Sequence, residues 1–152
     1  MKKLLFLIVA ILATSFSARS EELTGRGLTL RNNIQVFLRN QGYAPSIDDY
    51  GAIKFKCEGI TYYVAFQSFG NEYYVETYSM LGIDDTVRLQ VFEAANKTVK
   101  DTKFVRIEVF DSSVSFGCVS LVNTVADYER IFDDFMMILK KSREKMKNFY
   151  AE

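Results

Sequence analysis

The chain has 152 residues, of which 49% are hydrophobic and 25% charged, so it can bury a core and does not have the composition of a disordered protein. Nineteen basic and nineteen acidic residues give a formal net charge of zero. With no clustered basic stripe, this charge balance argues against nucleic acid or an anionic membrane surface as a partner. Histidine is absent, which removes the commonest general base and the commonest metal ligand.

The first twenty residues have the layout of a bacterial-type secretory signal peptide. Two lysines precede an unbroken apolar run, residues 4–13, and small residues follow it. The run is far shorter than the roughly 20 apolar residues needed to span a bilayer. Cleavage before Ala18 or before Glu21 would remove two or three cations and no acid, leaving a net charge of −2 or −3. We therefore expect an exported protein, periplasmic or secreted, without a stable membrane anchor after processing.

Beyond this signal peptide, assigned to residues 1–20, residues 21–152 contain no repeat, no low-complexity segment and no break in composition, which predicts one domain. In three segments apolar residues recur at helical spacing, which predicts helices. In five other segments the residues alternate or are rich in β-branched and aromatic types, which predicts strands. Short turns join successive strands, which predicts antiparallel pairing. The predicted helices cover residues 29–41, 84–100 and 126–149, and the predicted strands cover residues 52–57, 60–67, 72–80, 104–110 and 114–122.

The middle helix is apolar on more than one side. Asp84, Asp85 and Thr86 supply an N-cap and place acid at the positive end of the helix dipole. Leu89 and Phe92 lie off the main apolar stripe. We therefore expect this helix to contact more than one surface.

The last helix carries a regular apolar stripe, which we interpret as core: Tyr128, Ile131, Phe132, Phe135, Met136, Leu139, Ser142 and Met146. Its last turns contain five cations, where the helix dipole favours positive charge: Lys140, Lys141, Arg143, Lys145 and Lys147.

The order of the elements is helix, three strands, helix, two strands, helix (α-β-β-β-α-β-β-α). The natural two-layer solution is an α+β fold in which a five-stranded antiparallel sheet packs against helices mainly on one face.

This order and several local segments resemble the YbjN family, whose fold is similar to that of class I type III secretion chaperones. The resemblance is carried by the helix end at residues 38–43, the strand and turn at 53–59, the Ala-Asn segment at 91–96 and the strand that starts at 104–107. It covers residues 28–147. Family members often carry a second Asn in the middle helix, and here Val99 occupies that place.

The resemblance implies a binding protein rather than an enzyme. The family offers no catalytic residues or cofactor to carry over, and the related chaperones bind peptide segments, usually as homodimers through the middle helix and its neighbouring strand. In that topology the first and fifth strands are not neighbours. Cys57 and Cys118 are then expected to be separate thiols, because a disulfide needs α-carbons within about 7 Å. Composition alone leaves a disulfide open, since the expected compartment is oxidising.

Tyrosines and lysines gather on one predicted face of the sheet. Strand alternation places Tyr63, Tyr74 and Tyr78 opposite the inward-facing apolar residues, and we expect Lys54 and Lys56 to face the same way. Such a face is suited to protein binding, because tyrosine offers a large contact area with a polar tip. The alternative is an ordinary solvated sheet face, on which cross-strand aromatic pairs only stabilise.

No motif points to catalysis or to a metal. The carboxylate pairs Asp48-Asp49, Asp84-Asp85 and Asp133-Asp134 do not have the spacing of a calcium loop or a metal triad, and the serines lack a nucleophile-elbow motif. The sequence therefore predicts an exported, non-enzymatic module that binds a polypeptide. The alternatives are a small enzyme that works without histidine, or a self-associating structural protein of the cell envelope.

Overall fold

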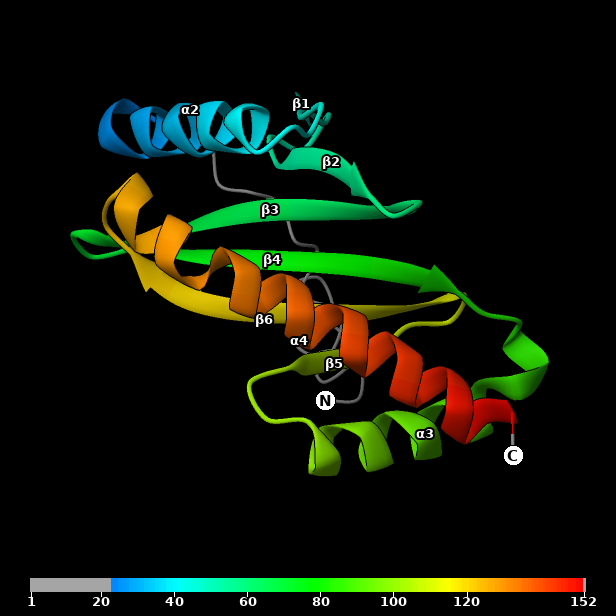
Figure 1. Ribbon diagram of the computed structural model, residues 1–152. Coiled ribbons are helices and arrows are strands. Elements are labelled where there is room, and N and C mark those ends of the chain that lie inside the picture. The colour runs from blue at the N-terminus through cyan, green and yellow to red at the C-terminus, as the bar shows by residue number, and fades with distance from the viewer. Residues whose placement is uncertain (1–22, 152) are drawn as a thin grey trace, which may run out of the picture.

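Six antiparallel strands form one sheet in the computed structural model, which describes residues 23–151, and the three helices of these residues lie on one face of that sheet (Figure 1). The predicted α+β class with helices on one face is confirmed. The expected signal peptide lies outside the described residues. With the labels of Figure 1, the elements are α2 (Gly25–Asn40), β1 (Ser46–Ile47), β2 (Ile53–Cys57), β3 (Ile60–Phe69), β4 (Glu72–Gly82), the 3-10 turn η1 (Asp85–Val87), α3 (Arg88–Asp101), β5 (Arg106–Val109), β6 (Ser113–Val122) and α4 (Val125–Ala151).

The strand order in the sheet is β1-β2-β3-β4-β6-β5. Tight turns join β2 to β3 and β3 to β4. Both residues of the first turn, Glu58 and Gly59, have positive φ (50° and 79°), as the two-residue turns that match strand twist require. After α3 the chain returns through β5 at the sheet edge, and β6 then inserts beside β4. The ladder between β4 and β6 runs from Tyr73–Val122 to Gly82–Ser113.

Within the described residues the sheet has one strand more than the five predicted. The additional strand, β1, is only two residues long and pairs with the start of β2. So short a segment shows no periodicity, and only its pairing partner defines it.

The core lies between the sheet and the helix layer. The predicted apolar stripe of α4 supplies Tyr128, Phe132, Phe135, Leu139 and Met146, all of which are buried. The ring of Phe132 is at the centre of an aromatic cluster, with ring centroids 5.3 to 6.2 Å from its own at Phe37, Tyr43, Phe55 and Tyr128. A hydrogen bond of 2.8 Å between Thr77 Oγ1 and Tyr128 Oη crosses the same interior and joins β4 to α4.

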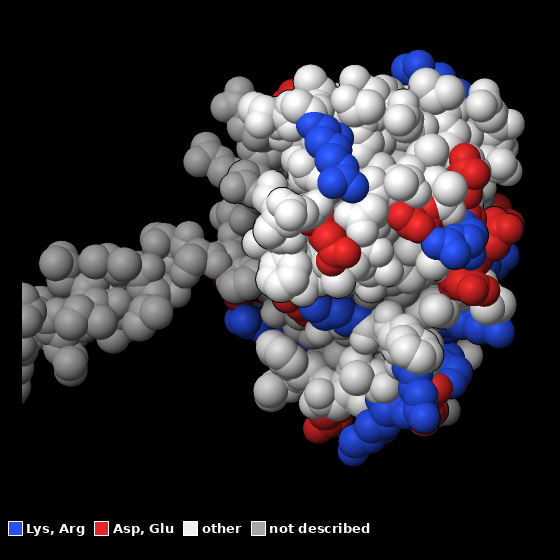
Figure 2. Space-filling view, turned by 90° about the vertical axis from the view of Figure 1, so that its left-hand side faces the viewer, with Lys and Arg blue, Asp and Glu red and all other residues white. Residues whose placement is uncertain are grey.

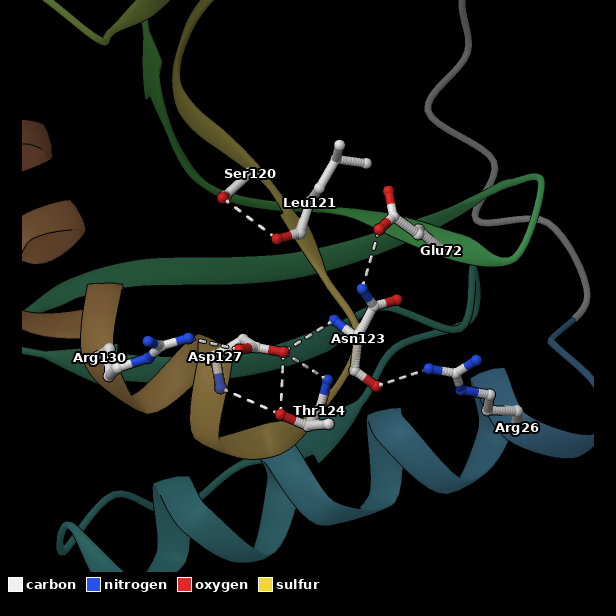
Figure 3. A network of polar contacts seen from close by, with 8 residues as sticks. All are labelled: Arg26, Glu72, Ser120, Leu121, Asn123, Thr124, Asp127 and Arg130. Atoms are coloured by element: carbon white, nitrogen blue, oxygen red, sulfur yellow. Dashed lines mark hydrogen bonds and ion pairs between the residues drawn. The ribbon is translucent and has the colours of Figure 1, made fainter.

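A reciprocal cap starts α4 and ties three parts of the chain together (Figure 3). The Thr124 N–H donates to Asp127 Oδ2 at 2.9 Å, and the Asp127 N–H donates to Thr124 Oγ1 at 3.3 Å, as in a capping box. Asn123 donates through Nδ2 to Glu72 Oε1 at 3.0 Å, and its carbonyl accepts from Arg26 of α2 at 3.4 Å. The junction of β6 and α4 is thereby held against the β3–β4 turn and the first turn of α2.

The hydrogen bonds from the Thr124 hydroxyl and N–H hold the pKa of Asp127 below its usual value. Because the folded-state pKa is the lower one, the stabilising contribution of this carboxylate is present at neutral pH and is lost on acidification through that lowered pKa.

We expect Thr124→Ala to lower the free energy of unfolding by about 1 kcal/mol, because the first turn of α4 loses a side-chain acceptor for an N–H that has no helical partner. Thr124→Ser keeps the hydroxyl and is the matched control. Urea denaturation of the two variants measures the difference, and equal stabilities would show that this cap contributes nothing.

One sequence-based expectation, the N-cap of the middle helix, needs correction. Asp84 accepts from the Thr86 N–H at 2.9 Å and so caps η1, whereas α3 begins at Arg88 without a side-chain cap. As expected, the middle helix contacts more than one surface, because α3 packs on both α4 and β5; Leu89, which is 79% exposed, and Phe92 remain exposed. Of the five cations noted in the last turns of α4, Arg143 is buried.

The two cysteines are free, as expected from the topology. Cys57 is on β2 and Cys118 is on β6, so two strands separate them in the sheet. Burial raises the pKa of Cys118 to about 12, which leaves it a neutral thiol packed in the core rather than a nucleophile.

Candidate functional site

The face of the sheet opposite the helices, called the open face below, carries every residue that the sequence singled out for binding. The strand registers and the alternation of buried and exposed residues assign these side chains to it: Lys54, Lys56, Tyr63, Phe69, Tyr74, Glu76, Tyr78, Met80, Arg106, Glu108, Val119 and Leu121. The predicted grouping of Lys54, Lys56, Tyr63, Tyr74 and Tyr78 on one face is therefore present in the structure; their role in binding stays a prediction.

Three of the predicted residues form one row across the strands. Lys54 of β2 pairs with Tyr63 of β3, and Tyr63 pairs with Tyr78 of β4. The two tyrosine rings stack, with centroids 5.1 Å apart and planes 18° from parallel. Burial raises the pKa of Tyr78 to about 12, so its hydroxyl stays protonated at neutral pH and can donate a hydrogen bond.

The row continues to an ion pair that the sequence analysis missed. Tyr78 pairs with Gly117 of β6, and Gly117 pairs with Arg106 of β5. Nη2 of Arg106 donates to both carboxylate oxygens of Glu76, at 2.7 and 2.8 Å. A β-carbon added at Gly117 would overlap Glu76 Oε1. The absence of a side chain at Gly117 therefore allows the Glu76 side chain to extend across β6.

Glu76 is held in a partly desolvated position. Burial raises the pKa of its carboxyl group above the usual value, and the Arg106 guanidinium pulls the same pKa down. The ion pair reaches across β6 from β4 to the edge strand β5, and Arg106 itself remains about half exposed. The pair is well placed to fix the orientation of a bound polar group. Nη2 of Arg106 also lies 3.7 Å from Glu108 Oε2, so a second carboxylate shares this guanidinium, and its negative charge adds to the rise in the pKa of Glu76.

A second aromatic pair lies nearer the β3–β4 turn. The rings of Phe69 and Tyr74 are 4.8 Å apart, and Phe69 is 54% exposed. On β6, the outward-facing Val119 and Leu121 are 42% and 43% exposed, and they pair with Glu76 and Tyr74 of β4. Apolar side chains thus extend across three central strands of the open face.

Sequence reasoning missed the contribution of β5 and β6 to this face. The outward positions of β6 already showed a usable signal, because Val119 and Leu121 are apolar where a solvated strand would carry polar residues. No sequence pattern pointed to Arg106, because its ion pair with Glu76 forms only when β6 lies between β4 and β5 in the sheet.

No cluster of three or more Cys, Asp or Glu side chains among residues 23–151 could hold a metal ion. In the same range no helix combines the length and apolar character needed to cross a bilayer.

Comparison with known proteins identifies the fold. No family model matches the chain, and no curated protein matches its sequence. Among solved structures, the chain is similar to the crystal structure of YbjN from E. coli, described as a proposed transcription regulator. The TM-score is 0.50 at 10% sequence identity, and the match covers 78% of this chain and 87% of that chain. The chain therefore has a YbjN-like fold.

Proposed function

We propose that this chain is an exported, non-enzymatic module that binds a polypeptide partner on its open face. The observation that carries the proposal is the group of exposed apolar and aromatic side chains on the central strands, where an antiparallel sheet with a solvated face would carry polar ones. Phe69, Met80, Val119 and Leu121 belong to this group, and the half-buried rings of Tyr63 and Tyr74 adjoin it. They offer the mixture of aromatic and aliphatic contact area that anchors protein interfaces.

Charge indicates the chemistry of the partner. Lys54 and Lys56 are exposed on the open face, and neither forms an ion pair within the described residues. Glu76, by contrast, is neutralised by Arg106. A segment with apolar side chains and acidic residues at one end would match this distribution.

The surroundings of the sheet also fit a protein partner better than a polyanion. Figure 2 shows an end of the molecule on which uncharged areas predominate at the height of α2, acidic and basic side chains are interspersed at the height of the sheet, and basic side chains gather nearer the height of α3. The fold shared with YbjN supports the architecture alone, and the regulatory role proposed for that protein is not carried to this chain.

The test is a comparison of captured proteins. Purified protein serves as bait in an extract of the periplasm or the medium, next to Tyr63→Ser/Tyr78→Ser. We expect the double variant to lose a partner that the unchanged protein retains, because both rings of the stacked pair are removed. Val36→Ser removes an exposed apolar side chain from α2 instead, and this control should retain the partner.

If the tyrosine variant retains every partner and its circular dichroism is unchanged, the open face is not the binding surface. Export is tested separately by sequencing the N-terminus of protein recovered outside the cytoplasm. We expect that sequence to start at Ala18 or Glu21.

The proposal includes a homodimer through α3. Leu89, Phe92 and Val99 are exposed on the outer side of this helix, away from its buried residues. Covering them would remove apolar surface from water, which favours association. Sedimentation velocity over a range of concentrations should show a dimer that Leu89→Ser shifts to monomer. A monomer at every concentration would contradict the dimer and leave the open-face proposal standing.

A further inference from the structure

One large apolar side chain is exposed on a strained stretch of backbone. Phe104, in the loop between α3 and β5, is 84% exposed and is not among the residues that pack on the core. Its φ angle is 68°, in the left-handed region that a bulky side chain rarely adopts. Glycine would suit this backbone better, and a polar residue would suit this exposure better. Neither the backbone nor the core therefore accounts for a phenylalanine at this position.

The surroundings of Phe104 are basic. The preceding segment, residues 97–103, contains one acid and three exposed lysines: Lys97, Lys100 and Lys103. None of these lysines forms an ion pair within the described residues. The acid, Asp101, is matched by Lys145 of α4, whose Nζ donates to the Asp101 carbonyl at 3.3 Å and lies 3.9 Å from its carboxylate. Positive charge is therefore in excess at this end of α3.

This basic group forms only when α3 packs on α4. Lys97 of α3 lies over the ring of Phe149, 5.7 Å from the centroid, and Lys145 of α4 lies beside the end of α3. The two segments are distant in the sequence, so no basic stripe is visible there. Figure 2 faces the side of the molecule on which α3 ends, and basic side chains gather there at the height of this helix. A chain without net charge thus carries a local positive surface.

An exposed aromatic ring within a basic surface matches an anionic lipid bilayer. Lysines are attracted to the phosphate groups of anionic lipids, and each contributes modestly to binding. An apolar side chain beside them can enter the boundary between the headgroups and the acyl chains, where it leaves water. A ring that projects alone suits a fluid lipid surface better than a protein interface, whose anchoring side chains are surrounded by packed contacts that exclude water.

We propose that the end of α3 attaches this protein reversibly to an anionic lipid surface, with the Phe104 ring among the headgroups and the three lysines against the lipid phosphates. Val99, in the last turn of α3, is 44% exposed and extends the apolar contact. One ring and a few lysines supply a weak attachment and not a permanent anchor. The contact uses no residue of the open face, so it does not rest on the binding or on the dimer proposed above.

The test measures binding to lipid vesicles. Purified protein is sedimented with vesicles of phosphatidylcholine and phosphatidylglycerol in equal parts, and with vesicles of phosphatidylcholine alone. We expect binding to the anionic vesicles only, weakened by added sodium chloride, because salt screens exposed charges. Phe104→Gly should weaken this binding about tenfold, since the ring no longer leaves water. It should not lower the melting temperature, because glycine adopts the left-handed conformation readily.

The charges are tested with pairs of lysines. Lys100→Gln/Lys103→Gln should weaken binding to the anionic vesicles by about tenfold or more. The matched control, Lys54→Gln/Lys56→Gln, removes two exposed lysines from the open face and should bind as the unchanged protein does. Phe69→Ser is the control for the aromatic substitution, since it removes a 54% exposed ring at the end of β3 and should also leave binding unchanged.

The proposal is wrong if the unchanged protein does not bind the anionic vesicles, if Phe104→Gly binds them equally well, or if both lysine pairs weaken binding equally. Self-association that Phe104→Gly abolishes in the absence of lipid would instead assign the ring to contact with a second copy. Binding of poly-L-glutamate that Phe104→Gly weakens as strongly as vesicle binding would assign it to an acidic polypeptide. The open face is tested with other variants, so either proposal can fail without the other.

Discussion

Phe132→Ala should lower the free energy of unfolding by about 3–5 kcal/mol, the usual cost of removing a large aromatic side chain from a packed core. Phe132 is buried, and its ring contacts rings from α2, from the segment after α2, from β2 and from α4 itself. Alanine would leave a cavity where these elements meet, and no single neighbour could fill it. Urea denaturation measures the loss as a lower midpoint with an unchanged slope.

Met137→Ala provides the control on the same helix. Met137 is 47% exposed, so its truncation should change the stability by less than about 0.5 kcal/mol. A cost below about 1 kcal/mol for Phe132→Ala would mean that the aromatic cluster relaxes around the gap, and that α4 is not held through this ring.

Tyr128→Phe should cost about 1–3 kcal/mol although it removes only one oxygen atom. Tyr128 and Thr77 are both fully buried, and their hydroxyl groups share the 2.8 Å hydrogen bond between α4 and β4. The phenylalanine ring would fill the same space and leave the Thr77 hydroxyl without this partner. Burial raises the pKa of Tyr128, so at any moderate pH the substitution removes a neutral hydroxyl group and not a phenolate.

A double-mutant cycle with Thr77→Val separates this effect from packing. If the two hydroxyls stabilise each other, the double variant should be more stable than the sum of the two single losses indicates. Additivity within about 0.5 kcal/mol would show that the two groups act independently. Chemical denaturation of all four proteins at one pH completes the cycle.

The parts of this fold that local pattern determines could be predicted. The stripe of α4 from Tyr128 to Met146 repeats over enough turns to define which side is buried, and the structure buries that side. Alternation likewise placed Tyr63, Tyr74 and Tyr78 on one face of the sheet, because a strand has only two faces.

What could not be predicted depends on contacts between distant segments. Arg143 looked like one more cation near a helix end, and only the packing of α4 on β4 places it beneath the helix. Leu89 and Phe92 showed that α3 has a second apolar side, but its apolar character could not reveal that the described chain leaves this side uncovered. The ion pair between Arg106 and Glu76 depends on the order of the strands in the sheet, which no local sequence pattern predicts.

The position of β6 in the sheet has a consequence for how the protein is made. Its ladder with β4 pairs the centre of the sheet, yet β6 is the last strand to leave the ribosome, and α4 follows it. Until then the β3–β4 hairpin exposes apolar side chains such as Val64 and Val75 that later become the core. The nascent chain therefore cannot complete its structure before synthesis is nearly finished, and until then it needs protection from aggregation.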